Sequence, residues 1–237
     1  MSLNSFEDLK KRLVEIKEMG FIKTHRVGET GIGKTLEDLL GINENNVPGP
    51  NALGWIELKT FRKDAKSMIT LFTLAPSPPK INSILLEKYG YTSLRGDRKI
   101  LHTTVNGLNF NTIKGNLGFK IDVEKDKINL VHFKDGVIAY WEEERLKDAF
   151  ERKIKNLLLI KAETRGEGKN EEFGFNEGYL LSEFSFKSFK KLIKEGIILI
   201  DIRIGQYCDG RTHDHGTGFR ILPDKLDLCY QNRVKIL

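Results

Sequence analysis

The pattern of apolar and polar residues along this chain predicts helices and strands that alternate from end to end. Apolar residues recur at helical spacing over residues 6–16, behind the N-cap pair Ser5 and Asp8, and Gly20 ends that helix. The same helical spacing predicts a short helix and two longer ones further on, at residues 36–40, 142–156 and 186–196.

Strand patterns fill the intervals between these helices. Two runs on either side of a charged turn predict a hairpin, a central stretch predicts a β-meander, and two short apolar runs predict buried strands. These segments are 55–61 with 67–74, 118–141, and 157–164 with 197–204. A polar loop at 205–219 precedes a last strand and helix. The class is therefore α/β or α+β, with a mixed central sheet flanked by helices, and residues 1–237 are expected to form one domain.

Composition narrows the class of protein only slightly. The chain has 237 residues, 39% of them hydrophobic, and a formal net charge of +6. That mild excess permits an acidic polymer as partner without requiring one. Apolar runs are too short for a membrane helix and the N-terminus resembles no export signal, so no membrane association is expected. With only Cys208 and Cys229, a disulfide scaffold is excluded and a reducing cytoplasm is expected.

Residues 28–35, GETGIGKT, match the phosphate-loop pattern G-x4-G-K-[ST]. Such a loop needs a buried strand that enters it, so that the following helix presents its N-terminus to phosphates. The segment before it contains Lys23, His25 and Arg26, which do not suit a central strand. A glycine turn ahead of a short helix is the simpler interpretation, and a phosphate-loop NTPase stays an alternative.

The segment WIELKTF carries a more informative pair. Glu57 and Lys59 are two residues apart on a predicted strand, so their side chains project from the same face. A carboxylate that holds Mg²⁺ beside an ammonium that orients water or stabilises phosphate charge is the centre of a phosphodiester-cleaving site. A further acid often comes from a neighbouring helix, and Glu37 is placed for that role. Alone, such a pair is also common on solvated surface strands.

The order of motifs along the chain strengthens this interpretation. GETGIGKTLEDLL, IELKT, KSMITLFT, IDIRIG and GRTHDHGTGFRI follow one another from residue 28 to residue 221. In this order they resemble the MvaI/BcnI family of restriction endonucleases, above all its MvaI-like branch, and through it the mismatch-repair nicking enzyme MutH. The resemblance covers nearly the full length.

This resemblance implies a MutH-like PD-(D/E)xK nuclease fold and Mg²⁺-dependent hydrolysis of double-stranded DNA by a monomer that nicks one strand at a time. By motif position, Glu57 and Lys59 match the catalytic acid and lysine, and Glu37 matches a helix-borne acid. Catalytic elements are expected in about residues 1–165 and recognition elements in about 166–237. An active enzyme would also require a cognate DNA methyltransferase as a functional partner.

One residue departs from the family pattern. Asn51 stands where the family has its first metal-binding aspartate, and a neutral amide is a weaker ligand for a hard cation than a carboxylate. Three explanations stay open: a deliberate substitution that traps uncut DNA, natural decay to a silent DNA-binding protein, or an acid supplied by Asp64. We expect this chain to bind its site but to cut it poorly.

The C-terminal third contains the residue types that read DNA bases. Arginine donates to guanine O6 and N7, and aspartate accepts from cytosine N4, so a G·C-rich site is expected. The candidates are Asp201, Arg203, Arg211, His213, Asp214, His215 and Arg220. The His-Asp-His segment has two alternatives, a transition-metal site and a plain solvated loop.

Two small residues bear on the central base pair of the site. Thr73 and Gly218 stand where family members that read a central G·C pair have histidines. This departure favours CCWGG over CCSGG within the CCNGG type. Lys66, Lys34, Lys80 and Arg62 are candidates for phosphate contacts, which position a duplex without reading its sequence.

Overall fold

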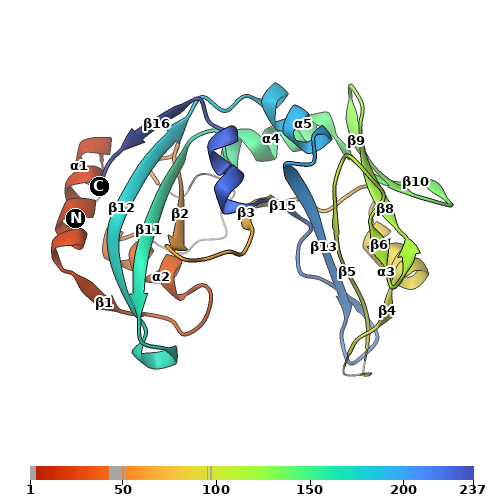
Figure 1. The fold of residues 1–237 in the computed structure, drawn as a ribbon, viewed down its shortest axis with the longest axis horizontal. Helices are drawn as coiled ribbons and strands as arrows, with labels where there is room; N and C mark the ends of the chain where they lie inside the picture. The colour runs from red at the N-terminus through yellow and green to blue at the C-terminus, as the bar shows by residue number, and fades with distance from the viewer. Residues whose placement is uncertain (1–3, 43–49, 51, 95, 97) are drawn as a thin grey trace. The chain divides into compact units, whose positions relative to one another are not determined.

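The fold is that of a computed structural model, which describes residues 4–42, 50, 52–94, 96 and 98–237 (Figure 1). By contacts the chain divides into two compact units. Unit 1 comprises Met1–Lys66, Arg152–Phe184 and Tyr230–Leu237, and unit 2 comprises Ser67–Glu151 and Ser185–Cys229. These units do not coincide with the linear division expected near residue 165, and a single domain over 1–237 stays a prediction.

Unit 1 is built on a mixed five-stranded sheet. Its order is β1-β12-β11-β2, with β16 also paired to β12. Only the pair β11–β2 is parallel, and β2 ends the path. The elements are α1 (Phe6–Glu18), β1 (Phe21–Lys23), α2 (Gly31–Leu40), β2 (Glu57–Arg62), β11 (Leu157–Arg165), the short 3₁₀ turn η1 (Gly168–Asn170), β12 (Glu172–Ser182) and β16 (Asn232–Lys235).

The two helices of unit 1 cover one face of this sheet. Leu9, Leu13 and Ile16 of α1 are fully buried in one cluster with Leu36 of α2 and Leu58 of β2. Ser5 caps α1 by accepting the Asp8 amide at 3.1 Å, as its sequence predicts. Because strand residues alternate between faces, the odd-numbered residues of β2 project from the opposite face.

Unit 2 contains a six-stranded sheet, a three-stranded meander and three helices. The large sheet has the order β3-β15-β13-β5-β4, with β14 paired to β13. Its strands are β3 (Ile69–Thr73), β4 (Tyr91–Thr92), β5 (Lys99–Val105), β13 (Ile198–Gln206), β14 (Thr212–Asp214) and β15 (Gly218–Ile221). The remaining elements are β6 (Thr112–Ile113), β7 (Asn116–Leu117), β8 (Phe119–Val123), β9 (Lys127–His132), β10 (Gly136–Glu142), α3 (Ile81–Tyr89), α4 (Glu143–Lys153), α5 (Phe186–Lys194) and the 3₁₀ helix η2 (Pro223–Leu228).

Aromatic side chains form the centre of unit 2. Phe219 stacks on Phe72 at a ring-centroid distance of 4.7 Å and meets Trp141 edge-on at 5.7 Å. Phe189 of α5 packs on both phenylalanines. Large buried aromatic residues of this kind hold the even-numbered face of β13, with Ile198, Ile200, Ile202 and Ile204, in the core. The odd-numbered face of β13 is therefore the polar one.

Two predictions about local structure are wrong. The runs 55–61 and 67–74 form no hairpin, because β2 pairs with β11 in unit 1 and β3 pairs with β15 in unit 2. Apolar and polar residues alternate in both strands as they do in hairpin strands, so this pattern alone could not reveal which strands they pair with. The expected last helix is the 3₁₀ helix η2, and a further strand, β16, follows it. The meander at β8–β10 is confirmed.

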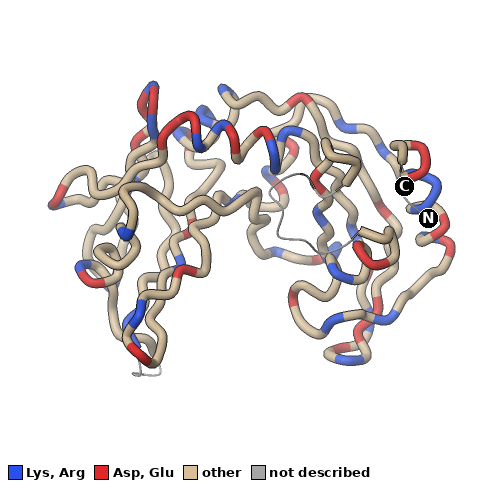
Figure 2. Tube along the Cα trace, turned by 180° about the vertical axis from the view of Figure 1, so that it is seen from behind, with Lys and Arg blue, Asp and Glu red and all other residues tan. Residues whose placement is uncertain are grey.

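Charge is spread over both units. Figure 2 shows basic and acidic positions interspersed along the trace instead of separated into two ends. The net charge of +6 therefore marks no single surface, and charged sites have to be located from individual contacts. Within the described residues, no helix combines the length and apolar character needed to cross a membrane.

Candidate functional site

A buried carboxylate marks the polar face of the unit 1 sheet. Glu57, the first residue of β2, is only 5% exposed. Its Oε1 lies 3.4 Å from Lys59 Nζ and its Oε2 lies 3.4 Å from Lys153 Nζ. A carboxylate this buried is retained as an ion only where cations or a metal compensate it. Here two ammonium groups compensate the charge of Glu57, but each lies 3.4 Å away and neither makes a short hydrogen bond.

The strand geometry explains why Glu57 and Lys59 meet. Leu58 between them points into the core beneath α1 and α2, so its two neighbours share the other face, as the sequence predicts. The parallel partner β11 places Leu157 beside Glu57 and Leu159 beside Lys59, and both leucines are buried. The charged pair therefore lies next to apolar residues, where electrostatic interactions are stronger than in water.

Lys153 is a residue that sequence reasoning missed. It is the last residue of α4, lies in the segment Arg152–Phe184 of unit 1, and is 96 positions from Glu57 in the sequence. The sequence shows only a lysine near the end of an amphipathic helix, a common position for a basic residue. Nothing in its spacing identifies it, because the end of α4 meets β2 only through tertiary packing.

The three other acid or amide candidates at this site differ in position. Asn51 lies outside the described residues. Glu37 is half-buried on α2, which packs on the sheet face opposite Glu57. Asp64 follows the far end of β2, and the five residue steps of that strand alone span about 16 Å. The proposal that Asp64 supplies the missing carboxylate beside Glu57 is therefore wrong.

The residues of the phosphate-loop pattern make local contacts that stabilise the turn and the start of α2. Its lysine, Lys34, forms an ion pair with Asp38 at 2.7 Å. The hydroxyl of Thr35 donates to the Gly31 carbonyl at 2.8 Å and accepts the His25 amide at 2.9 Å. The strand before the motif, β1, has three residues and lies at a sheet edge. The arrangement matches a glycine turn that opens α2 and lacks the central strand that nucleotide binding requires.

Unit 2 contains a second buried carboxylate, on the polar face of its large sheet. Asp201 of β13 is 4% exposed. Its Oδ2 accepts from Arg203 Nε at 2.7 Å and lies 3.1 Å from Arg220 Nη1, while its Oδ1 accepts from the Thr104 hydroxyl at 3.1 Å. The contacts with Arg203 and Thr104 have the distances of good charge-assisted hydrogen bonds, and the contact with Arg220 is an ion pair. Asp201 thereby fixes the direction of two guanidinium groups.

Register explains how residues far apart in sequence share this face. Asp201 lies opposite Thr104 on β5 and Gly218 on β15, and Gly218 lies opposite Thr73 on β3. Arg203 lies opposite His102, so that ring belongs to the same face. The sequence predicts the same-face pair Asp201 and Arg203 by spacing. Thr104 and His102 were missed, because only strand pairing brings them there.

Burial and neighbouring positive charge lower the pKa values of two residues on this face, Arg220 and His102. Burial lowers the pKa of Arg220, with Asp201 opposing and Arg203 adding to that shift. Its Nε is buried without a hydrogen-bond partner among the described residues. Burial also lowers the pKa of His102, and Arg203 adds to the effect. An unsatisfied buried donor is costly, so holding Arg220 beside Asp201 carries an energetic cost for the fold.

The 205–219 loop divides the remaining candidates. Asp214 pairs with Ile204 and projects from the opposite face of the sheet, where Asn82 Nδ2 donates to its Oδ2 at 2.6 Å. Its Oδ1 accepts the Gly216 amide at 2.8 Å. Both oxygens of Asp214 are thus engaged in holding the loop. Arg211 is exposed and pairs with Asp209 at 2.7 Å.

His213 and His215 meet edge-on at a centroid distance of 4.1 Å, and His102 lies 6.4 Å from His215. Within the described ranges no group of three or more His, Cys, Asp or Glu is placed to hold a metal ion. This finding gives the transition-metal alternative no support. Lys66 is exposed at the end of the first segment of unit 1.

Comparison with known proteins identifies the fold. The family model of the MvaI/BcnI restriction endonuclease family matches residues 10–230. The chain belongs to this family. A search of curated proteins gave no match.

Two solved structures extend this result. "Restriction endonuclease MvaI-cognate DNA substrate complex" is 33% identical with a TM-score of 0.84, and "Restriction endonuclease MvaI in the absence of DNA" is 31% identical with a TM-score of 0.60. Each covers 100% of both chains. Membership of the MvaI/BcnI family makes this protein a type II restriction endonuclease, a site-specific deoxyribonuclease that binds DNA, with the PD-(D/E)xK fold expected from its motifs.

Proposed function

We propose that this chain is a Mg²⁺-dependent monomeric nuclease that cuts DNA at a CCWGG-type site, one strand at a time. The observation that carries the proposal is the buried Glu57 carboxylate between Lys59 and Lys153, each at 3.4 Å. In the proposed site the Glu57 carboxylate holds a cation, and the ammonium groups act on the phosphate or on the attacking water.

The donor set suits a hard divalent cation. Among the described residues, the side-chain partners of the two Glu57 oxygens are ammonium groups at 3.4 Å, so both oxygens retain acceptor capacity. Restriction endonucleases generally use divalent metal ions, and carboxylate oxygen is the ligand that Mg²⁺ prefers. Glu57 would hold the ion, with the Asn51 carbonyl as a weaker second ligand. When bound, the ion would supply positive charge to the scissile phosphate.

The protein residues have distinct roles in this proposal. Lys59 lies on the same face as Glu57, so its ammonium can donate to the attacking water or to the phosphate oxygen. Lys153 holds Glu57 from the other side and fixes its orientation. Glu37 is assigned the role of a helix-borne acid because α2 contacts β2, the strand that carries Glu57 and Lys59, although α2 packs on the sheet face opposite Glu57. Lys66 contributes a phosphate contact.

Asn51 determines how active the chain is. Replacing a carboxylate ligand by an amide removes a full negative charge from a divalent-metal site and weakens metal binding. We therefore expect weak cleavage by the chain as it stands, with DNA binding retained. An active enzyme would in turn need a methyltransferase to protect the DNA of its host.

Recognition is assigned to the Asp201 face of unit 2. Arg203 and Arg220 each keep donors beyond those used by Asp201, and a guanidinium pairs with guanine O6 and N7. His213, His215 and Arg211 extend this surface from the adjoining strand and loop. Asp214 acts indirectly, because its oxygens hold the loop. The face therefore suits the G·C pairs at the ends of the site.

Thr73 and Gly218 favour A·T at the central pair. They are register partners on β3 and β15. Thr73 has a small side chain and Gly218 has none, so neither occupies the space that a larger base-reading side chain would take. A Cβ at position 218 would lie 3.0 Å from Arg220 Nε, so a histidine there would require that arginine to move.

The test is cleavage of supercoiled plasmids that carry CCWGG or CCSGG, with Mg²⁺ or EDTA, by this chain and its Asn51→Asp variant. The proposal predicts that the variant first nicks and then linearises the CCWGG plasmid, only with Mg²⁺. Preference for CCSGG would contradict the assigned specificity. If neither protein cuts while both bind duplex DNA, the chain is a silent DNA-binding protein.

A further inference from the structure

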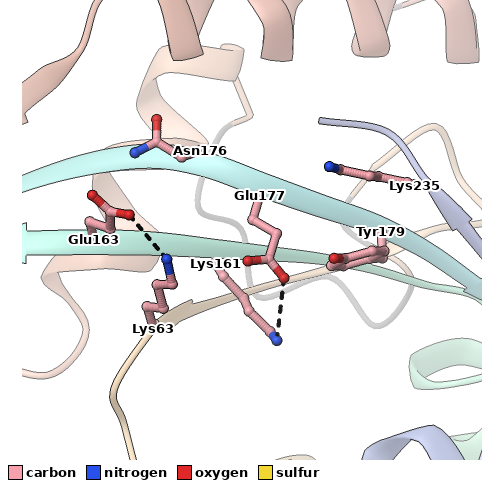
Figure 3. Close-up of a pocket in the computed structure, with 7 residues that line it drawn as sticks. All are labelled: Lys63, Lys161, Glu163, Asn176, Glu177, Tyr179 and Lys235. Carbon is pink, nitrogen blue, oxygen red and sulfur yellow. Dashed lines mark hydrogen bonds and ion pairs between the residues drawn. The ribbon is translucent and has the colours of Figure 1, made fainter.

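A basic pocket lies on the same sheet face as Glu57, towards the other edge of the unit 1 sheet. Its volume is about 210 Å³, and β11, β12, β16 and the residue after β2 contribute to it (Figure 3). The lining residues are Lys63, Lys161, Glu163, Asn176, Glu177, Tyr179 and Lys235. None of them is used by the catalytic centre proposed above.

Strand register connects this pocket to the active-site lysine. Lys59 pairs with Leu159 on β11, Leu159 pairs with Tyr179 on β12, and Tyr179 pairs with Lys235 on β16. These four residues form one row across the sheet. Three strand spacings of about 4.8 Å put Lys235 about 14 Å from Lys59. The rise of roughly 3.4 Å per nucleotide is measured along the helix axis, and the winding phosphates of one strand are farther apart than that, so the span corresponds to a few phosphates at most.

Two of the three lysines in the pocket have carboxylate partners. Lys63 Nζ lies 3.1 Å from Glu163, and Lys161 Nζ lies 3.5 Å from Glu177 (Figure 3). Tyr179 donates to Glu177 and lowers the pKa of that acid, so Glu177 stays ionised. The two glutamates thereby balance two lysines and hold their ammonium groups at the wall of the pocket.

Lys235 supplies the uncompensated charge. Among the described residues its ammonium has no ion pair, and Arg233 beside it stacks on the Tyr179 ring at 3.8 Å. A β-bulge between Lys161 and Ala162 lets both Asn176 and Glu177 of β12 reach the pocket. The pocket therefore has a net positive charge of one and is lined by amide and ammonium donors, which suits one phosphodiester anion.

We propose that this pocket binds a backbone phosphate of the DNA strand that flanks the scissile bond, with Lys235 as its principal cation. The assignment rests on the proposed function, because it takes the Glu57 face as the face that meets DNA. It adds a positioning site at a defined distance from the active site. Such a contact holds the duplex in register without reading its sequence.

The experiment measures duplex binding as a function of salt, in EDTA, for the unmutated chain, Lys235→Gln and Lys235→Arg. Lys10→Gln is the matched control, because Lys10 is exposed on α1, over the opposite sheet face. Loss of one phosphate contact lowers the slope of log K against log[salt] by about 0.9. We expect that loss for Lys235→Gln alone, with Lys235→Arg and Lys10→Gln unchanged.

A second measurement removes the same contact from the DNA side. Duplexes with a single neutral methylphosphonate at successive positions should show one position, within a few phosphates of the cut, where affinity falls. That penalty should disappear in Lys235→Gln, because the two changes remove the same contact. An unchanged salt slope in Lys235→Gln, or a penalty that persists in it, would overturn the assignment.

Free phosphate is a separate source of the same anion. Stabilisation of the unmutated chain, but not of Lys235→Gln, by inorganic phosphate, together with an unchanged salt slope on DNA, would assign the pocket to free phosphate and overturn the proposal. Failure of the unmutated chain to bind any duplex would contradict the proposed function itself. Loss of the Lys235 effect alone leaves that function standing.

Discussion

Glu57 in unit 1 and Asp201 in unit 2 are both buried carboxylates on the polar face of a sheet, yet their surroundings differ. Glu57 faces two lysines at 3.4 Å. Asp201 is bound by Arg203 at 2.7 Å, by Arg220 at 3.1 Å and by the Thr104 hydroxyl at 3.1 Å. The first carboxylate is compensated but not saturated with hydrogen bonds, whereas the second has good partners on both oxygens.

The difference follows from the chemistry of the two cations. Lysine is a compact point charge on a flexible chain, while the planar guanidinium of arginine forms fixed, directed hydrogen bonds. A carboxylate between lysines keeps oxygens that a metal ion can bind. A carboxylate between arginines instead holds those arginines in place for a ligand beyond them. We therefore propose that Glu57 takes part in the reaction and that Asp201 positions recognition residues.

The largest expected effect is on cleavage. In the Asn51→Asp background, Glu57→Gln should reduce the single-turnover cleavage rate by about 10²–10³-fold, the scale seen when one preorganised electrostatic group is lost. Duplex affinity in EDTA should change little. Glu18→Gln, at an exposed position of α1, is the control. Equal losses of rate and of affinity would mean that the two carboxylates do not have separate roles.

Asp201→Asn should affect binding and folding more than the chemical step. It keeps the shape but leaves Arg203 and Arg220 without their shared counter-charge. The free energy of unfolding should fall by about 2–3 kcal/mol, below the usual cost for a buried pair because both arginines are partly exposed. Discrimination between cognate and non-cognate duplexes should fall as well. Asp224→Asn, on exposed η2, should leave both unchanged.

Lys153 offers a finer test, because its ammonium competes with a metal ion for Glu57. Removing that charge with Lys153→Met, in the Asn51→Asp background, should lower the Mg²⁺ concentration for half-maximal cleavage by about two- to fivefold. The maximal rate should fall, since Glu57 loses one of the groups that orient it. Lys153→Arg should restore the metal dependence. A purely structural role would reduce the rate without moving the Mg²⁺ midpoint.

The smallest effect concerns pH. Burial beside Arg203 lowers the pKa of His102, so the unfolded chain binds this proton more readily than the folded protein does. Stability from this residue is therefore present above the ordinary pKa of about 6.5 and is lost as the pH falls towards the lowered value. Denaturant unfolding at pH 7.5 and pH 5.5 should show a smaller loss in His102→Gln. An identical loss in both proteins would count against this contribution.

The sequence predicted elements and short-range pairs better than it predicted tertiary neighbours. Spacing of two residues placed Glu57 with Lys59 and Asp201 with Arg203 on common faces, because alternation in a strand is a local property. The same rule would have placed Asp214 and His213, which are neighbours in sequence, on opposite faces of their strand. Instead, their adjacency in sequence makes both of them base-reading candidates, and in the structure Asp214 faces Asn82.

What the sequence could not supply depends on pairing across long separations. Thr104 reaches Asp201 only because β5 pairs with β13, and Lys153 reaches Glu57 only because α4 ends beside β2. The wrong hairpin has the same origin, since β2 and β3 each pair with strands far along the chain. The family resemblance, by contrast, rests on short motifs in order, which are visible without any contact.

The most direct test of the distinct roles of the two carboxylates measures cleavage rate and duplex affinity in parallel. Glu57→Gln and Asp201→Asn, both in the Asn51→Asp background, would be assayed on cognate and non-cognate duplexes, with binding in EDTA and single-turnover cleavage in saturating Mg²⁺. We expect Glu57→Gln to lose cleavage and keep selective binding, and Asp201→Asn to lose selective binding while it still cuts at high protein concentration. The same pattern of losses in both variants would contradict the account.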